Sequence, residues 1–515
     1  MEGNNQENVK NSIGRLVFVG ISLLLQLGWI LWLFIKLNIY SGYISLAISI
    51  LALILALHIY GKNENAAFKM PWIILVIVLP VFGICLYVLF GRAGAVGYTR
   101  RRYENVIEKS DGILKQDAQT ADALEKEDFA IANQARYVRD YARYPVYRGT
   151  AVQYYGWGQD VIADQKEELK KAEKFIFMEY HAIEDSASFH AVEQILVDKV
   201  RQGVEVRLFY DDMGSIGFIN PAFVKRMEAE GIQCRVFNPV MPMLNIFMNN
   251  RDHRKVTVID GRVGFTGGYN LADEYFNITH PYGVWKDTGV KLTGLAVRSL
   301  TLMFLEMWNT MKPSDDTYAP YLPQLAPADC PPDDGYVLPY ADSPLDDERV
   351  GENVYMNIIK NAKHTLYIST PYLILDDEMI LELCLAAKCG VDVRIMTPGI
   401  PDKKLVYRVT RSYYPALARG GVRIFEYTPG FNHAKLMLCD DEVATVGTIN
   451  LDYRSLYLHF ENGAYLYKCK AVRDIRADFD GLWPQCNEVT EQCRAARSAA
   501  LRVSQSILRL FAPLM

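Results

Sequence analysis

Two matching sets of polar residues, far apart in the chain, are the best candidates for chemistry. Each set begins with His-x-Lys and continues with an aspartate and an asparagine at the same offsets from the histidine. The first set is His253, Lys255, Asp260 and Asn270, and the second is His433, Lys435, Asp440 and Asn450. A single His-x-Lys arises often by chance, whereas four residue types repeated at one spacing predict a duplicated half-site.

These residue types are suited to an anionic phosphodiester. Two imidazoles can act in turn as nucleophile and as general acid or base. One would attack phosphorus and form a phosphohistidine, while the other protonates the leaving alkoxide and then deprotonates the incoming hydroxyl. Lys255 and Lys435 would neutralise the non-bridging oxygens, and Asn270 and Asn450 would donate to them as charge builds in the transition state. One histidine and one lysine in each half ligate a metal poorly, so we expect no metal and no other cofactor.

Two further carboxylates are candidates for orienting the histidines, because the tautomer of an imidazole is set by the partner of its other nitrogen. Asp287 follows the first set and Glu461 follows the second, and both are predicted to orient a catalytic histidine. Asp260 and Asp440 complete the catalytic motif. They fall at the far ends of the predicted strands, where holding the turn is the expected role.

The remaining histidines stand in no comparable context. His181 and His459 are among them, and they are interpreted as surface or core residues. Tyr180 and Tyr372 lie near the end of the first long strand of each half and are candidates to line a cleft.

The elements around the two sets repeat as well. Each set is predicted to form a buried strand, a tight turn and a second strand. Upstream of the first set, strands are predicted at 152–155, 174–180, 204–210 and 233–237, with helices at 158–172, 187–202 and 221–230. Upstream of the second set, the matching elements are strands at 364–369 and 391–396 and a helix at 379–388. Strands alternating with helices predict an α/β fold with mixed or parallel sheets flanked by helices. Two pseudo-symmetric lobes would bring the equivalent strand ends together at one seam.

The start of the chain predicts a membrane protein. Apolar runs at 16–35, 43–60 and 72–90 are each close to the ~20 residues that a spanning helix needs. An arginine cluster follows the third run, which places the catalytic part in the cytoplasm of a multi-pass protein of the cell membrane. Three spans put the N-terminus outside. If one run is re-entrant, both ends lie inside, and Pro71 and Pro80 make the third run the candidate.

Six regions are therefore predicted. They are a membrane region with two or three transmembrane helices (1–92), a charged helical stalk (93–150), a first lobe (151–322), a linker (323–340), a second lobe (341–485) and a basic amphipathic C-terminal helix (486–515).

The composition indicates which classes of partner the protein is expected to bind. The 515 residues are 50% hydrophobic, with a net charge of −5 and a pI near 6.0. The chain therefore carries no overall basic signal for nucleic acid. Nine cysteines without CxxC spacing argue against a disulfide framework or a structural zinc site. Membrane lipid is the expected partner, and the oligomeric state is open.

With its two His-x-Lys-x₄-Asp motifs, the chain resembles the phospholipase D superfamily. The apolar start and the two-lobed body resemble bacterial cardiolipin synthases within it. The residues that carry this likeness are Leu89-Phe-Gly-Arg92, Asn250-Arg-Asp-His253-Arg-Lys255, Thr266-Gly-Gly-Tyr-Asn270 and Gly447-Thr-Ile-Asn450-Leu-Asp452-Tyr-Arg454-Ser455. The resemblance implies two phospholipase D-like lobes behind N-terminal transmembrane helices. It also implies transfer of a phosphatidyl group between two phosphatidylglycerol molecules, with release of glycerol and without metal or nucleotide.

Other functions remain open at this point. A phospholipase D-type phosphodiesterase would use water as acceptor, and phosphatidylethanolamine is a further acceptor lipid. A membrane-tethered nuclease is disfavoured by the acidic net charge. A non-catalytic membrane scaffold is disfavoured by the intact double motif. Which histidine is the nucleophile does not follow from the residues.

Overall fold

The computed structural model describes most of the chain. The described residues are 17–18, 20–22, 24–29, 32, 42–62, 65–90, 97–220, 222–240, 249–312, 317–325, 330–332, 334–346, 348–495, 499–510 and 512. Eight of the twenty residues of the first apolar run lie outside them, as do Gly91 and Arg92 of the motif after the third run.

Each half of the catalytic body forms one mixed sheet. The first has the strand order β1 (Thr150–Tyr155), β9 (Gly289–Gly294), β7 (Val263–Gly267), β6 (Lys255–Ile259), β2 (Phe175–Tyr180), β3 (Glu205–Asp211) and β4 (Gln233–Phe237). The second has the order β10 (Tyr336–Asp342), β17 (His459–Tyr467), β16 (Val443–Gly447), β15 (Leu436–Cys439), β11 (Thr365–Ser369), β12 (Asp392–Pro398), β13 (Arg423–Tyr427) and β18 (Cys486–Glu488). The two orders match strand for strand, and β18 extends the second sheet.

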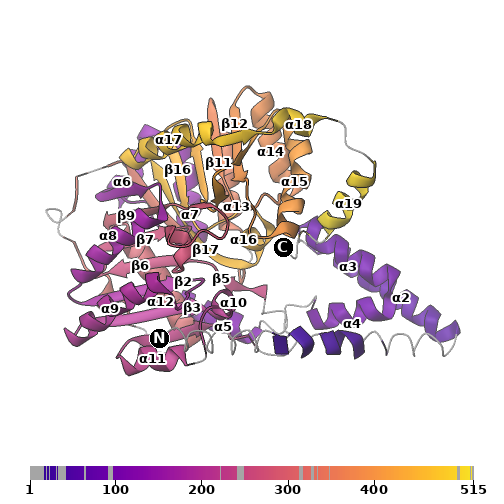
Figure 1. Ribbon diagram of the computed structural model, residues 1–515, viewed down its shortest axis with the longest axis horizontal. Helices are drawn as coiled ribbons and strands as arrows, with labels where there is room; N and C mark the ends of the chain where they lie inside the picture. Colours follow the sequence, from indigo (N-terminus) through magenta and orange to yellow (C-terminus); the bar gives the residue numbers. More distant parts are fainter. Residues whose placement is uncertain are drawn as a thin grey trace.

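Strand directions match too. β2, β3 and β4 are parallel, and β6, β7, β9 and β1 follow through antiparallel pairs. The second sheet repeats this pattern, with β11, β12 and β13 as its parallel strands. The predicted α/β fold with two pseudo-symmetric lobes is therefore confirmed. In Figure 1 the first lobe (magenta) lies below the second (orange to yellow).

Amphipathic helices cover the sheets. The first lobe has α8 (Gly158–Lys170), α9 (Ala187–Arg201), α11 (Phe223–Ala229) and α12 (Val297–Met311). The second lobe has α13 (Val350–Asn361), α14 (Asp377–Lys388), α15 (Lys404–Arg419) and α17 (Lys470–Leu482). Almost every residue of α12 is buried, because it lies in the hydrophobic core that joins the two lobes. That shared core holds the lobes in one fixed relation.

Two short strand pairs cross from one lobe to the other. β5 (Arg251–Asp252) of the first lobe runs parallel to the start of β17. β14 (Gly430–Asn432) of the second lobe runs parallel to β8 (Val284–Lys286) of the first. Each crossing strand leads directly into one His-x-Lys motif, so the seam predicted from the repeat is built from backbone hydrogen bonds.

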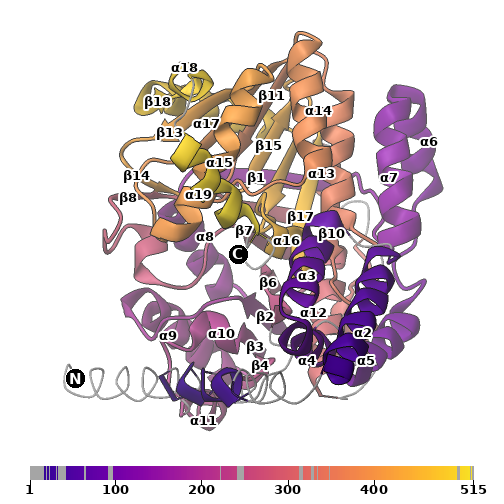
Figure 2. The same cartoon turned by 90° about the vertical axis from the view of Figure 1, so that its right-hand side faces the viewer.

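The predicted stalk is helical, and its helices lie against the body. They are α5 (Gly97–Ser110), α6 (Ala118–Glu127) and α7 (Phe129–Ala142). Ser110 Oγ donates to Glu306 of α12 at 2.6 Å, and Tyr137 OH donates to Glu348 of the second lobe at 2.6 Å. Figure 2 shows α6 and α7 along the flank of the body. Apolar residues on these helices, such as Val138, join the common core, so the segment braces both lobes.

Two predicted boundaries move. The second lobe begins with β10 at Tyr336, five residues before its predicted start at 341, because this strand pairs along its whole length with β17. The C-terminal segment is not one helix: β18 and α18 (Thr490–Arg494) precede α19 (Ala499–Leu510). Arg509 of α19 donates to Ser412 Oγ at 3.1 Å, which ties that helix to α15.

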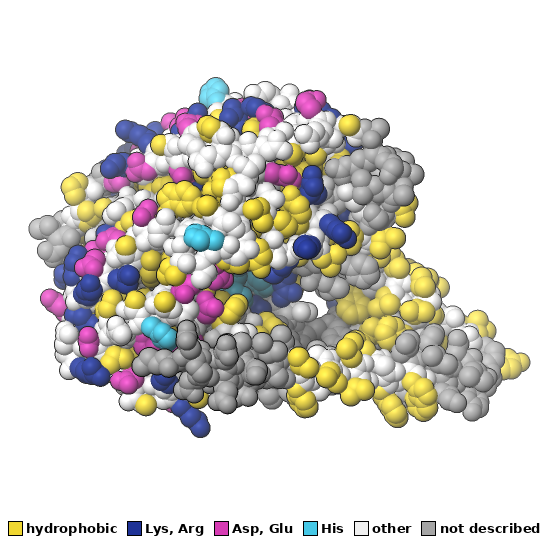
Figure 3. Space-filling model, in the orientation of Figure 1, with side chains coloured by type: hydrophobic (Ala, Val, Ile, Leu, Met, Phe, Trp, Pro, Cys, Tyr) yellow, Lys and Arg dark blue, Asp and Glu magenta, His cyan; other side chains and the backbone are white. Residues whose placement is uncertain are grey.

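The N-terminal helices form an apolar arm beside the body. Among the described helices, one is long and apolar enough to cross a bilayer, the stretch Tyr43–Tyr60 of α2 (Gly42–Tyr60). The third apolar run is broken into α3 (Ala66–Val78) and α4 (Pro80–Phe90). A Cβ added at Gly83 would meet the Leu75 carbonyl oxygen at 2.6 Å, so α4 folds back on α3. Figure 3 shows apolar side chains along this arm and a hollow between the arm and the body.

Asp260 and Asp440 hold the turns at the far ends of the motif strands. Asp260 accepts the main-chain N–H groups of Glu173, Lys174 and Phe175, each at 2.8 Å. Asp440 accepts three equivalent N–H groups before β11. Both aspartates have a left-handed backbone with φ 52°, which aspartate tolerates better than most residues. The sequence also predicts Asp260 and Asp440 as catalytic residues, but their hydrogen bonds give them the role of holding the turns.

Replacing Asp260 by alanine is expected to cost stability rather than catalysis. Loss of its three hydrogen bonds and the strain of alanine at positive φ should lower the free energy of unfolding by about 2 kcal/mol. Asp260→Asn, which keeps one oxygen and tolerates the conformation, should lose less. Thermal unfolding and turnover of the detergent-solubilised variants measure both effects. Loss of turnover with unchanged unfolding in Asp260→Asn would restore a catalytic role.

Candidate active site

His253 and His433 lie at the seam, each directly after a crossing strand. The main-chain N–H of His253 donates to the Phe460 carbonyl at 2.9 Å, and that of His433 donates to the Lys286 carbonyl at 2.7 Å. Their exposed fractions are 8% and 6%. These bonds extend the parallel pairs by one residue, so the backbone of each lobe fixes the histidine of the other.

Each histidine is held by a carboxylate of the opposite lobe. His253 Nδ1 lies 2.9 Å from both oxygens of Glu461, and His433 Nδ1 lies 2.7 Å from Asp287 Oδ2. Asp287 and Glu461 thus meet the two histidines as orienting carboxylates should, in a crossed arrangement. Because Nδ1–H donates to the carboxylate, Nε2 of each histidine keeps its lone pair for chemistry.

The two motif lysines line the same pocket. Lys255 Nζ donates to the main-chain oxygen of His253 at 2.6 Å. Lys435 Nζ donates to the main-chain oxygen of His433 at 2.5 Å and lies 2.9 Å from His433 Nε2. Both lysines are 1% exposed. These two buried cations, one at the start of β6 and one just before β15, give the pocket a positive charge that an anionic phosphate would neutralise.

Burial and mutual repulsion set the protonation of this cluster. Burial, with the charges of the two lysines, holds the pKa values of His253 and His433 well below the ordinary value, so both are neutral near pH 7. Burial also lowers the pKa of Lys255 to about 8 and that of Lys435 to about 7. The pKa of Asp287 rises to about 6 because of burial, against the opposing charge of Lys435.

Asn270 and Asn450 lie just beyond the second strands of the motifs. Asn270 Oδ1 accepts the Ala182 main-chain N–H at 3.1 Å, and its amide donates to Tyr275 OH at 2.8 Å. Asn450 is 5% exposed, and its Oδ1 has no hydrogen-bond partner among the described residues. Donation by either amide to a phosphate remains a prediction.

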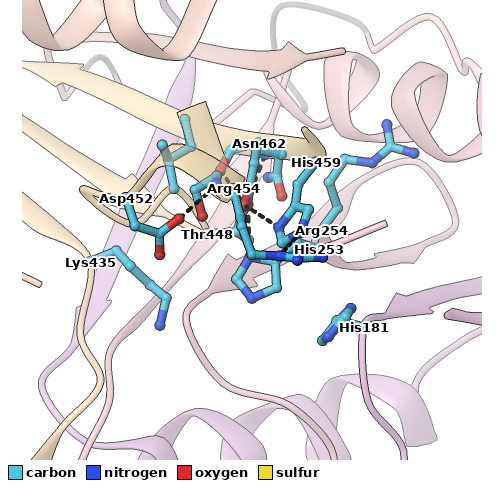
Figure 4. A network of polar contacts seen from close by, with 12 residues as sticks. His181, His253, Arg254, Lys435, Thr448, Asp452, Arg454, His459 and Asn462 are labelled. Atoms are coloured by element: carbon cyan, nitrogen blue, oxygen red, sulfur yellow. Dashed lines mark hydrogen bonds and ion pairs between the residues drawn. The ribbon is translucent and has the colours of Figure 1, made fainter. Parts of the chain in front are cut away.

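Two histidines that sequence reasoning set aside lie beside His253. The ring centroids are 4.9 Å apart for His181 and His253 and 5.5 Å apart for His459 and His253. Figure 4 shows His459, Thr448 and Asn462 around His253, with His181 and Lys435 on its other sides. A signal existed for each: His181 follows the strand end that meets the seam, and His459 stands two residues before Glu461.

Tyr180 and Tyr372, the two candidates to line a cleft, differ in position. Tyr180 is fully buried in the first lobe, where its hydroxyl meets Thr257 Oγ1 at 2.9 Å, so it does not line the cleft. Tyr372 is half-buried, with its ring centroid 6.5 Å from that of Phe431. Since Phe431 is itself 5.8 Å from His433, Tyr372 stands near the second half-site.

One cluster at the seam has the composition of a metal site. His253, His459 and Glu461 bring ligand atoms within 4.8 Å of one another, a set that zinc accepts. Arg454 Nε donates to His459 Nε2 at 3.2 Å, and arginine is always protonated, so the His459 proton is on Nδ1. His253 Nδ1 also carries a proton, which it donates to Glu461. The nitrogens that face the carboxylate are therefore donors, and the residues do not fit a metal ion.

The pKa values of the two lysines predict how kcat/KM falls on the alkaline side of its pH profile. Binding of an anionic phosphodiester requires charged lysines, and Lys435 loses its charge as the pH rises through about 7. We expect kcat/KM to fall above that pH. Arginine stays protonated, so Lys435→Arg should move the limb up by about one unit, to the pKa of about 8 of Lys255. Rates from pH 6 to 9 on micelles of an anionic phosphodiester lipid test this, and a limb that stays near pH 7 contradicts it.

Comparisons with known proteins agree with this geometry. A family model described as cardiolipin synthase, PLD-like domain, matches the chain twice, at residues 166–292 and 355–483. A second, described as phospholipase D-nuclease N-terminal, matches residues 50–92. The two matches of the first model coincide with the two lobes, each containing one His-x-Lys motif.

Individual relatives extend over nearly the whole chain. An uncharacterized protein of Streptococcus mutans is 43% identical over 463 residues, covering 89% of this chain and 99% of the relative. A cardiolipin synthase of Halalkalibacterium halodurans is 31% identical over 525 residues, covering 98% and 100%. The crystal structure of Haemophilus influenzae phosphatidylserine synthase shares the fold, with a TM-score of 0.54 at 11% identity over 74% of this chain and 98% of that one. The chain therefore belongs to the cardiolipin synthase family of phospholipase D-like phosphatidyltransferases.

Proposed function

We propose that the protein joins two phosphatidylglycerol molecules into cardiolipin and glycerol. The observation that carries the proposal is the crossed pair His253–Glu461 and His433–Asp287, which provides two oriented imidazoles in one buried seam. A two-step transfer requires two imidazoles, because in each step one of them forms or breaks a bond to phosphorus while the other transfers a proton.

In the first step, Nε2 of one histidine attacks the phosphorus of the donor lipid. The N–P bond forms, and the bond from phosphorus to the oxygen of the headgroup glycerol breaks. That oxygen takes a proton from the other histidine. That histidine is neutral in the free site, and the negative charge of the bound phosphate raises its proton affinity, so that its Nε2 takes up a proton from solvent when the substrate binds. Glycerol then leaves, and a phosphatidyl-histidine remains.

In the second step, the histidine that lost its proton removes one from the primary hydroxyl of a second phosphatidylglycerol. The new O–P bond forms, the N–P bond breaks, and both histidines return to their starting state. Lys255 and Lys435 bind the non-bridging oxygens throughout, with further donation from Asn270 and Asn450. Burial of the seam favours a lipid hydroxyl over water as acceptor.

The membrane arm supports a lipid substrate and a particular topology. Asn65, before α3, donates to Asp376 and Tyr457 of the second lobe at 3.1 and 3.0 Å, and α5, after α4, packs on α12. Both ends of the α3–α4 hairpin thus meet the body. Its helices have 13 and 11 residues, short of the ~20 that cross a bilayer. We take the hairpin as re-entrant, with 16–35 and α2 as spans and with body and N-terminus both in the cytoplasm.

A vesicle assay tests the reaction. Purified protein in phosphatidylglycerol vesicles should convert labelled lipid into cardiolipin and release one glycerol per cardiolipin. His253→Ala and His433→Ala should each lose at least ~10²-fold in rate while unfolding at the wild-type temperature, because each step uses both imidazoles. Phosphatidic acid as the main product would show that water is the acceptor and would reject the proposal.

Cysteine labelling tests the topology. In a background without the native cysteines, Lys62→Cys and Lys115→Cys should react with a membrane-impermeant maleimide only after the cells are permeabilised. Leu79→Cys, at the tip of the hairpin, should stay unreactive from outside in intact cells. Labelling of Leu79→Cys from outside would instead mean that α3 and α4 reach the opposite surface.

A further inference from the structure

An aromatic ring with an N–H group stands two residues before each orienting carboxylate. In the first lobe it is Trp285, before Asp287, and in the second it is His459, before Glu461. Residues two apart in extended chain point to the same face. The ring and the carboxylate of each pair therefore lie side by side at the seam.

The two rings hold the same position against the catalytic histidines. The centroids of Trp285 and His433 are 5.4 Å apart with the planes inclined at 47°. Those of His459 and His253 are 5.5 Å apart at 42°. An indole and an imidazole differ in size and polarity, yet the pseudo-symmetric places are filled alike. What the two rings share is an aromatic N–H donor.

Both N–H groups are buried and available. His459 Nδ1 and Trp285 Nε1 form no short, well-aligned hydrogen bond among the described residues, yet the Trp285 N–H is near enough to Asp287 to lower the pKa of that carboxyl. Arg454 occupies His459 Nε2, which leaves the proton on Nδ1, and Nδ1 lies 3.6 Å from Glu461 Oε1. A buried polar group without a close partner is destabilising. A shift of a few tenths of an ångström would satisfy both the donor and the carboxylate.

The carboxylates need such donors. Glu461 and Asp287 are fully buried, and burial disfavours an ionised carboxylate unless several hydrogen bonds reach it. Glu461 accepts from the Thr448 hydroxyl, and Asp287 accepts the Thr288 main-chain N–H at 2.9 Å, each in addition to its histidine. Active-site hydrogen bonds that are long without substrate often shorten when the site is occupied.

We propose that His459 and Trp285 are positioning residues whose ring N–H groups close onto Glu461 and Asp287 when substrate enters. Each keeps its carboxylate ionised and aimed at Nδ1 of the catalytic histidine across the seam. The inference rests on the proposed phosphatidyl transfer. It adds a third member to each histidine–carboxylate pair, in the order aromatic donor, carboxylate, catalytic histidine.

Substitutions that keep a ring and remove the N–H test the proposal. His459→Phe and Trp285→Phe should each lower kcat for cardiolipin formation about tenfold and leave KM unchanged, because the proposed role of each ring is to position a carboxylate and not to bind lipid. His459→Asn, which restores a donor, should recover part of the rate. Trp483→Phe is the matched control: its indole N–H also lacks a partner, but it packs against Phe479, away from the seam, and its kcat should equal that of wild type.

The pH profile separates positioning from packing. Loss of a donor raises the pKa of the carboxylate, and the carboxylate must be ionised to hold the histidine. Activity is lost as the pH falls through that pKa. In Trp285→Phe the acid limb of kcat should therefore lie at higher pH than in the wild-type protein, because the Trp285 N–H lowers the pKa of Asp287. A lower kcat with an unmoved limb would mean that the ring only packs.

Double variants give the decisive comparison. If His459 acts through Glu461, the pair His459→Phe with Glu461→Gln should be no slower than Glu461→Gln alone. The same holds for Trp285→Phe with Asp287→Asn. Additive losses would overturn the inference, as would wild-type kcat in both single variants. If the wild-type protein makes no cardiolipin, the proposed function fails instead, and the two failures are thereby distinct.

Discussion

The site depends on two short pairs of parallel strands that cross between the lobes. β5 leads into His253 and pairs with the start of β17, and β14 leads into His433 and pairs with β8. A parallel pair keeps its register from one residue to the next, so each histidine emerges opposite the carboxylate that comes directly after the last paired residue of the other strand. Neither lobe alone contains a complete histidine–carboxylate pair. Folding of both halves around one core is therefore a condition for the chemistry.

Burial then decides the charge state. Lys255 and Lys435 are held in the seam at a cost that lowers their pKa values, and the histidines are neutral beside them. Without substrate, the two lysines thus lack enough negative charge around them to remain fully protonated. An anionic phosphodiester supplies that charge and stabilises the protonated lysines, so substrate binding and protonation reinforce each other. A neutral ligand would gain none of this energy.

The membrane arm and the body are also joined by specific contacts. Asn65 before α3 reaches the second lobe, and α19 lies between α15 and α3. These contacts hold the apolar helices beside the body, with a hollow between the two (Figure 3). The proposed re-entrant hairpin would therefore hold the body at the membrane surface, where its lipid substrate lies.

The sequence by itself determined the repeat, the strand–helix order of both lobes and the two His-x-Lys sets, because periodicity and motif spacing are local properties. It also indicated that Asp260 and Asp440 hold turns. The tertiary structure alone decided the crossed pairing of His253 with Glu461 and His433 with Asp287, since no local pattern specifies which segments of two lobes become neighbours. The same holds for His459, which looked incidental until the strand register set it beside His253. The fold of the third apolar run, too, required three dimensions, because a proline marks a break but not the direction of the chain after it.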